Sequence, residues 1–308
     1  MPSTPYDITL GTSGSSTTVK QIRSCTHNIN GTVVNAFGSG EVGPAQLFQG
    51  NTPQTSAVST TDLGTVLGLN TATFISSGLF ILTGNTDLPY RKRASGAIYA
   101  AGGSHTALRG ISTLVTPDTI NASQGESATL DFTLRHRSTQ PSGVTTPPGE
   151  TPPTAEITGT TLSAAAAVTA EYMLHSVKIA GTAVPSVQSV TITPGISVMD
   201  QFSGGLPYPV DYFVNEVVPT IEITTDDLES ASGLLEAAAL GSGVTVYLAK
   251  RSDGGVFVDT TTSVHIAITA AAGLQQATTL GGDSRSNSSG TIRINAKTLT
   301  ASITSAIS

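Results

Sequence analysis

The sequence predicts a mainly β protein made of two tandem copies of one domain, each copy a β-barrel or β-sandwich with one short α-helix. Three observations lead to this prediction. Short identities recur along the chain at one constant separation, the separation between Asp62 and Asp227. Runs that alternate apolar and polar residues, or that are rich in β-branched residues, fill most of each half. One stretch in each half breaks this alternation at the same aligned position, with the pattern of a helix.

We call the separation between Asp62 and Asp227 the repeat offset, and it defines the predicted domains. A constant separation sustained along so much of the chain is hard to obtain by chance, even in a sequence rich in Ser, Thr, Gly and Ala. The matches include Asp62-Leu63 with Asp227-Leu228, Gly68-Leu69 with Gly233-Leu234, Ser77-Gly78 with Ser242-Gly243, Asp118 with Asp283, Gly125 with Gly290, and Thr133-Leu134 with Thr298-Leu299. They predict a first domain over residues 1–137, a proline-rich linker over 138–169 and a second domain over 170–308. Residues 157–170 fit either the linker or the first strand of the second domain.

Most of each domain is expected to form antiparallel strands, separated by Gly- and Asn-rich breaks. The expected strands of the first domain are 17–24, 27–35, 45–60, 73–83, 94–101, 106–115 and 126–137. Those of the second are 171–180, 186–193, 196–202, 209–224, 243–250, 256–270, 274–280 and 290–304.

The helical segment is clearest in the second domain, between Thr225 and Gly241. Thr225 is a suitable N-cap, acidic residues follow it where the helix dipole favours them, and Gly241 suits the C-terminal stop. The aligned stretch of the first domain, Thr60 to Leu69, is shorter but keeps the Asp62-Leu63 pair.

The strongest expected strand lies within residues 210–224. Its second half alternates strictly, so one face is apolar and the other is polar and acidic. The apolar face is Val217, Pro219, Ile221 and Ile223, and the opposite face is Glu216, Val218, Thr220, Glu222 and Thr224. Pro219 lacks an N–H, which favours an edge position or a bulge.

The polar face of this strand has two interpretations. It is either an ordinary solvated sheet face, or part of the wall of a channel shared by both domains. The aligned positions of the first domain carry no charge. On the channel interpretation the lining residues are Glu216, Thr220 and Glu222 with Asn51, Thr55 and Ser59.

A glycine-containing loop precedes this region in each domain, at residues 202–209 and 37–44. Such loops are either mobile hairpin tips or stacking contacts to a subunit above or below. On the second interpretation the contacting residues are Phe37, Gly38, Gly40, Phe202, Gly204 and Gly205.

Composition and motifs point away from catalysis. Only 11% of residues are charged, which fits a surface largely covered by other copies of the chain. The second part, residues 138–308, carries six basic and fourteen acidic groups, so a basic nucleic-acid footprint is not expected. The histidines have no metal-ligand spacing, and no phosphate-binding loop or nucleophile elbow occurs. We therefore expect no enzyme, catalytic residue, cofactor or metal site.

The remaining features concern Cys25, the N-terminus and the one basic cluster. Cys25 is the only cysteine and is expected to be a small buried residue. The sequence shows no signal peptide and no apolar run of membrane-spanning length, so assembly in the cytoplasm is expected. The cluster Arg91-Lys92-Arg93 is either solvated or a contact to an acidic patch of a neighbouring subunit.

This layout resembles the tail tube proteins of long-tailed, siphovirus-like bacteriophages, in the variety with two tube domains per chain. The resemblance rests on the duplication, the single helix per domain, the amphipathic strands 45–60 and 209–224, and the loops 37–44 and 202–209. It implies the fold shared with contractile-tail and type VI secretion tubes, and stacked rings of three chains with pseudo-six-fold symmetry. It further implies a virion tail location, passage of DNA through the lumen without specific binding, and contacts to tape-measure and tail terminator or tip proteins.

Two other functions remain open at this point. A capsid decoration or fibre protein could be built from two β-sandwich modules. A tandem carbohydrate-binding adhesin module is the other alternative, although such modules usually expose aromatic platforms and this chain has no tryptophan.

Overall fold

A computed structural model describes residues 8–12, 15–37, 44–69, 80–90, 104–138, 149, 152–161, 171–227, 242–252, 256–281 and 289–307. Within these ranges the protein is mainly β, as predicted. The first half of the chain contains β1 (Ile8–Thr12), β2 (Ser15–Val19), β3 (Ile22–Ile29), β4 (Val33–Phe37), β5 (Pro44–Gln49), β6 (Gln54–Thr60), α1 (Leu63–Gly68), β7 (Phe80–Tyr90), β8 (Ser104–Ser123), β9 (Thr129–His136) and β10 (Thr154–Thr161).

The described part of the second half consists of strands and their connections. The strands are β11 (Glu171–Ile179), β12 (Thr182–Ala183), β13 (Val187–Thr193), β14 (Ile196–Gln201), β15 (Asp211–Val217), β16 (Thr220–Thr225), β17 (Ser242–Arg251), β18 (His265–Gly281), β19 (Ser289–Asn295) and β20 (Thr298–Ser305). Among the described residues, sixteen strands join into one hydrogen-bonded network, while β4–β5 and β14–β15 form separate two-stranded hairpins.

The pairing pattern of the first half recurs in the second half. In the first half the described pairs are β1–β2, β1–β7, β3–β6, β4–β5, β6–β9, β7–β8, β8–β9 and β8–β10. In the second half they are β11–β12, β11–β17, β13–β16, β14–β15, β16–β19, β17–β18, β18–β19 and β18–β20. Each pair of one half therefore has a counterpart in the other.

Two irregularities in the ladders of the first half recur in the second half. The β3–β6 register shifts between Ile22 and Ser24, and the β13–β16 register shifts between Val187 and Ser189, which are related by the repeat offset. Just before each shift, a non-glycine residue has a left-handed backbone, Gln21 at φ 51° and Ser186 at φ 49°. These two irregularities therefore lie at positions separated by the repeat offset.

The offset shortens further along the chain. The β8–β9 ladder shifts between Pro117 and Thr119, whereas the β18–β19 ladder shifts between Ala277 and Thr279. We call the separation between Pro117 and Ala277 the shorter offset. It relates β9 to β19. The sequence alignment of Thr133-Leu134 with Thr298-Leu299 instead placed β9 on β20, because it allowed no change of length between the helix and the last strands.

Several predicted boundaries need correction. The expected strand 45–60 is interrupted at 50–53, and the expected strand 209–224 is interrupted at Val218-Pro219. Pro219 lies at this break, where its carbonyl accepts a hydrogen bond of 2.9 Å from the Ala296 N–H. The predicted linker contains β10, which pairs with β8. The expected strand 94–101 and most of 73–83 lie outside the described residues.

The helix of the first half is confirmed as α1. Asp62 is its N-cap, with a carboxylate oxygen that accepts a hydrogen bond from the Thr65 N–H at 3.4 Å. Leu63, Val66 and Leu67 are buried, and α1 contacts β2 of its own half and β20 of the other half. The corresponding expected helix, from Thr225 to Gly241, lies outside the described residues after Asp227.

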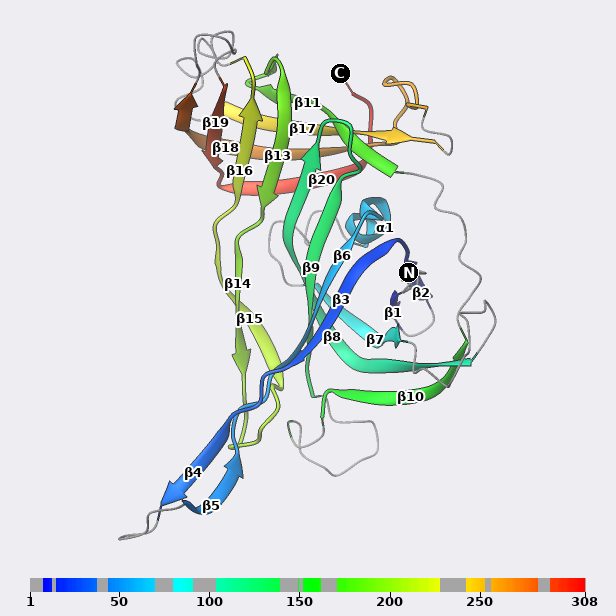
Figure 1. The fold of residues 1–308 in the computed structure, drawn as a ribbon, viewed down its shortest axis with the longest axis vertical. Helices are drawn as coiled ribbons and strands as arrows, with labels where there is room; N and C mark the ends of the chain where they lie inside the picture. The colour runs from blue at the N-terminus through cyan, green and yellow to red at the C-terminus, as the bar shows by residue number, and fades with distance from the viewer. Residues whose placement is uncertain are drawn as a thin grey trace.

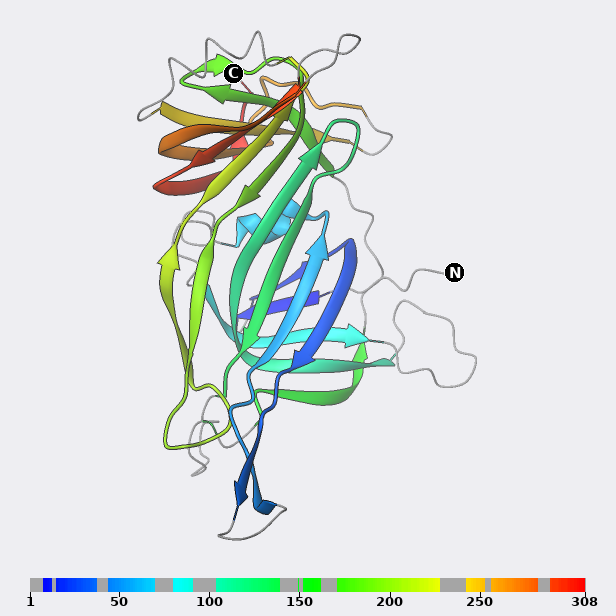
Figure 2. The same cartoon turned by 60° about the vertical axis from the view of Figure 1, so that its left-hand side comes forward.

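One buried apolar cluster extends through both halves, from Ile8 in β1 to Ala301 in β20. Figure 1 shows the strands of the second half, apart from β14 and β15, gathered at one end of the molecule and those of the first half below them. The hairpin β4–β5 extends away from the body of the protein, whereas β14–β15 runs alongside the first half. Figure 2 shows the same arrangement from another side.

Candidate assembly surface

A continuous polar sheet face extends across both halves. Residues of β6, β9, β16 and β19 alternate between buried and partly exposed positions, so each strand has one core side and one open side. The polar sheet face consists of the open-side residues Thr55, Ala57, Ser59, Asp118, Thr119, Asn121, Asp131, Thr133, Arg135, Thr191, Thr220, Glu222, Thr224, Thr291, Arg293 and Asn295. Threonine dominates it, which suits a solvated strand surface.

The register places these residues directly opposite one another. Thr55 is opposite Arg135, and Ser59 is opposite Asp131, on neighbouring strands of the first half. In the second half, Glu222 is flanked by Thr191 on one side and by Arg293 on the other. Residues opposite each other in antiparallel strands share a face, so the open sides form one surface.

Four of the predicted channel residues lie on this surface and two do not. Thr55 and Ser59 lie on β6, and Thr220 and Glu222 lie on β16. Asn51 is exposed in the link between β5 and β6, and Glu216 lies on β15, opposite Ser197 of the hairpin partner strand. The break at Pro219 explains the second difference, because it separates Glu216 from the strand to which Glu222 belongs.

The charge of the surface is mixed, whereas the sequence suggested an acidic one. Arg293 Nη1 lies 3.6 Å from Glu222 Oε1. Thr133 donates a hydrogen bond of 2.7 Å to Asp118, and burial raises the pKa of that carboxyl group. Asp118, Asp131, Arg135 and Arg293 were not predicted here, because only the pairing of distant strands brings them to one face.

The two halves are joined by pairing between β8 and β13. Ser123, Ala122, Asn121 and Ile120 are opposite Ser189, Val190, Thr191 and Ile192, respectively. On the polar side of this joint, the Thr191 hydroxyl donates to Asn121 Oδ1 at 3.1 Å. On the core side, Ile120 and Ile192 are buried. Among the described strands this is the one ladder between the halves.

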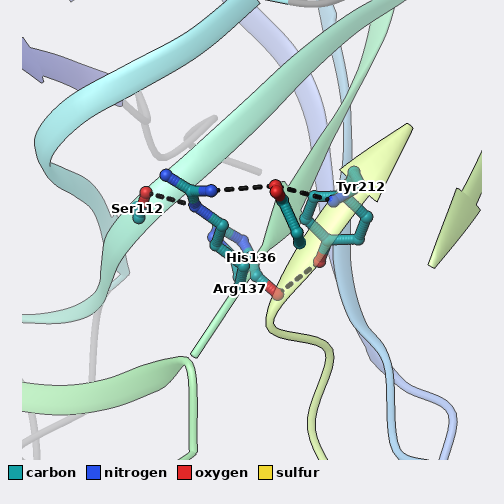
Figure 3. Close-up of polar contacts among 5 residues, drawn as sticks. Ser112, His136, Arg137 and Tyr212 are labelled. Carbon is teal, nitrogen blue, oxygen red and sulfur yellow. Dashed lines mark hydrogen bonds and ion pairs between the residues drawn. The ribbon is translucent and has the colours of Figure 1, made fainter. Parts of the chain in front are cut away.

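The hairpin β14–β15 is docked onto the first half where β9 ends (Figure 3). The Tyr212 hydroxyl donates to the His136 carbonyl at 2.5 Å, and Arg137 Nη1 lies 2.9 Å from Asp211 Oδ1. Arg137 Nε also donates to the Ser112 hydroxyl at 2.8 Å, which orients the guanidinium group. Tyr212 is only 4% exposed, and burial raises its pKa.

The loops predicted to contact other subunits are described only in part. Between β14 and β15, Gly204 and Gly205 adopt left-handed φ values of 63° and 73°, as a tight turn requires. Phe202 is half-buried in this loop, and the Pro207 carbonyl accepts a hydrogen bond of 2.7 Å from the Thr52 N–H. This loop thus contacts the link between β5 and β6. In the other loop, Phe37 ends β4, while Gly38 and Gly40 lie outside the described residues.

A histidine cluster that sequence reasoning missed lies on the core side of the first half. Ser56 Oγ lies 3.0 Å from His27 Nδ1 and 3.0 Å from His136 Nε2, and Thr113 Oγ1 lies 3.1 Å from His136 Nδ1. Burial, and then the proximity of His27, lowers the pKa of His136 to about 3. The two histidines lie far apart in sequence, so no local spacing could reveal their contact.

The remaining observations concern metal-binding side chains, Cys25, the basic cluster and membrane-spanning helices. Within the described ranges no group of three or more His, Cys, Asp or Glu is placed to hold a metal ion. Cys25 is half-buried, and desolvation raises its pKa to about 11, so its thiol is protonated at neutral pH. Arg91-Lys92-Arg93 lies outside the described residues. In the part of the chain that is described, no helix has the length and apolar character needed to cross a bilayer.

In comparisons with known proteins, the chain matches no protein-family model and no curated protein.

Proposed function

We propose that this protein is a structural subunit that assembles with copies of itself into rings around a channel, as in the tail tube of a siphovirus-like bacteriophage. On this proposal the chain carries two copies of one tube domain, and three chains form a pseudo-six-fold ring. The rings stack into a tube in the virion tail, assembled in the host cytoplasm.

The observation that carries the proposal is the repeated pairing scheme with one ladder between its two units. Each described strand pair of the first half has a counterpart in the second half. The shift in β3–β6 matches the shift in β13–β16 at the repeat offset, and the shift in β8–β9 matches the shift in β18–β19 at the shorter offset. The β8–β13 ladder joins the units within the chain. Two equivalent units joined head to tail leave one equivalent edge unsatisfied at each end, and repeating the contact between chains closes a ring if the rotation permits.

The unsatisfied edge in the first unit belongs to β3. By the repeat offset, Ser24, Cys25, Thr26 and His27 occupy the positions of Ser189, Val190, Thr191 and Ile192. Among the described strands, β13 pairs with both β16 and β8, whereas β3 pairs with β6 alone. The proposal assigns the other side of β3 to the end of β18 in the next chain.

The polar sheet face is the proposed channel wall. Its strands run continuously from β6 to β19, its side chains are mainly hydroxyls and amides, and its acidic and basic groups nearly balance. A basic wall would bind the phosphates of DNA, so a wall without excess positive charge suits passage without specific binding. Tape-measure and tail terminator or tip proteins are the proposed further partners.

Negative-stain electron microscopy at rising protein concentration tests this function. Hollow tubes with a regular ring repeat, and a sedimenting species of three 31.2 kDa chains, are the expected result. Solid fibres or decorated shells would favour a fibre or decoration protein instead. A monomer at every concentration, with affinity for glycans, would favour a carbohydrate-binding module.

A further inference from the structure

We propose that the β4–β5 hairpin of one chain docks onto the turn between β19 and β20 of a second copy of the same chain. This inference rests on the proposed ring assembly and names the residues that join its subunits. The contact would repeat between chains the docking of β14–β15 onto the end of β9 that occurs within one chain.

The two hairpins are equivalent in register. In β4–β5, Val34 is opposite Phe48 and Asn35 is opposite Leu47. In β14–β15, the opposed pairs are Met199 with Phe213 and Asp200 with Tyr212. The repeat offset relates each of these positions to its counterpart. Leu47 therefore occupies the place of Tyr212, and by the same offset Gln46 occupies the place of Asp211.

Their surroundings differ sharply. Tyr212 is 4% exposed against the body of the protein, whereas Leu47 is 65% exposed. Val33 and Val34 on the neighbouring strand are also exposed, and no residue of β4 or β5 is charged. The hairpin extends away from the body of the protein (Figure 2). An uncharged hairpin with several exposed apolar side chains is typical of a surface that another chain covers.

The surface proposed to bind β4–β5 is found by applying the shorter offset to the residues that hold β14–β15. The residues that hold β14–β15 are Arg135, His136 and Arg137, at the end of β9. The shorter offset relates them to Asn295, Ala296 and Lys297, between β19 and β20. Arg137 and Lys297 are both basic, and Lys297 is exposed. The equivalent of the Arg137–Asp211 ion pair is thus Lys297 of one chain beside Gln46 of another.

The same correspondence places β3 of one chain beside the end of β18 of the other chain. Within one chain, docking of β14–β15 accompanies the β8–β13 ladder. Between chains, docking of β4–β5 would accompany pairing of β3 with the end of β18, where Leu280 and Gly281 correspond to Ile120 and Asn121. Hairpin and edge strand then form one head-to-tail interface, which uses different surfaces on the two partners.

A charge-reversal pair tests this interface. Gln46→Lys places like charges together and is expected to raise the protein concentration needed for assembly about tenfold. Adding Lys297→Glu to Gln46→Lys should restore assembly, because the pair then attracts. The matched control is Gln124→Lys, which makes the same change in an exposed turn remote from both hairpins. An equal loss in that control would show that net charge governs assembly and would overturn the assignment.

Cross-linking of mixed chains gives an independent readout. One chain carries Gln46→Cys and the other Lys297→Cys, both with Cys25→Ser, and a short bis-maleimide is added. A covalent heterodimer is expected, with none when Val256→Cys replaces Lys297→Cys. If rings form but no cross-link appears and Gln46→Lys assembles normally, the docking is wrong and the proposed function stands. If the unmodified chain never assembles, both are wrong.

Discussion

The hairpins β4–β5 and β14–β15 share a strand register but occupy opposite environments. The second is fixed to the first half by a buried tyrosine and an ion pair, and the first stands in solvent with leucine and valine exposed. Side chains follow this difference: Tyr212 and Asp211 can hydrogen-bond a neighbour within the chain, while Leu47 and Gln46 offer apolar surface and a neutral amide. Equivalent backbones can therefore serve a permanent internal joint and a contact that forms only on assembly.

The largest expected effect is on the free energy of unfolding, and it distinguishes the two hairpins. Tyr212→Ala should lower the free energy of unfolding by about 3–5 kcal/mol, since it removes a buried aromatic side chain and leaves the His136 carbonyl without its donor. Leu47→Ala should change it by about 0.5 kcal/mol or less in the monomer, because that side chain is already hydrated. Urea unfolding of dilute, monomeric protein measures both values. Similar losses in the two variants would mean that β4–β5 is packed in the isolated chain.

A second expected effect concerns the docking site itself. In the first half it lies over the His27–Ser56–His136 cluster, whereas the equivalent positions of the second half are Ile192, Ile221 and Ala296. The folded-state pKa of His136 is about 3, below the value near 6.5 of an unfolded chain. The unfolded state therefore binds more protons between these values, and stability falls as pH drops below about 6.5. From pH 7 to 5.5 the loss should be about 1 kcal/mol, measured by urea unfolding.

The triple variant His27→Ile, Ser56→Ile, His136→Ala copies the second half and provides the control. Its free energy of unfolding, measured by urea over the same pH range, should lack this contribution. A slope as steep as that of the parent would assign the pH dependence to other groups. Asp118, Asp200 and His175, whose pKa values burial also shifts, are unchanged in this variant, so their contribution is common to both proteins.

The sequence predicts those features that neighbouring residues determine, and it misses those that depend on contacts between segments far apart in the chain. Alternation within residues 220–225 correctly placed Ile221 and Ile223 in the core. The helical stretch expected from Thr60 to Leu69 contains α1, although the helix begins only after the Asp62 cap. Both signals, the alternation and the helical stretch, are local. Pairing between β8 and β13, the meeting of His27 with His136, and the docking of Tyr212 are set by contacts between distant segments, which no local pattern encodes. The change from the repeat offset to the shorter offset likewise escaped an alignment held at one register.

The smallest expected effect tests whether charge or burial fixes the internal hairpin. Asp211→Asn makes this position neutral, as Gln46 is in the other hairpin. The Arg137–Asp211 pair is only partly shielded, with side-chain exposures of 21% and 48%, so its loss should cost about 0.5 kcal/mol. Urea unfolding at low and at high NaCl concentration should show the difference from the parent shrinking at high salt, because exposed ion pairs are screened. A loss as large as that of Tyr212→Ala would mean that the ion pair holds the hairpin. A small loss would leave the buried tyrosine as the main contact, and would explain how an apolar residue such as Leu47 can serve at the same position between chains.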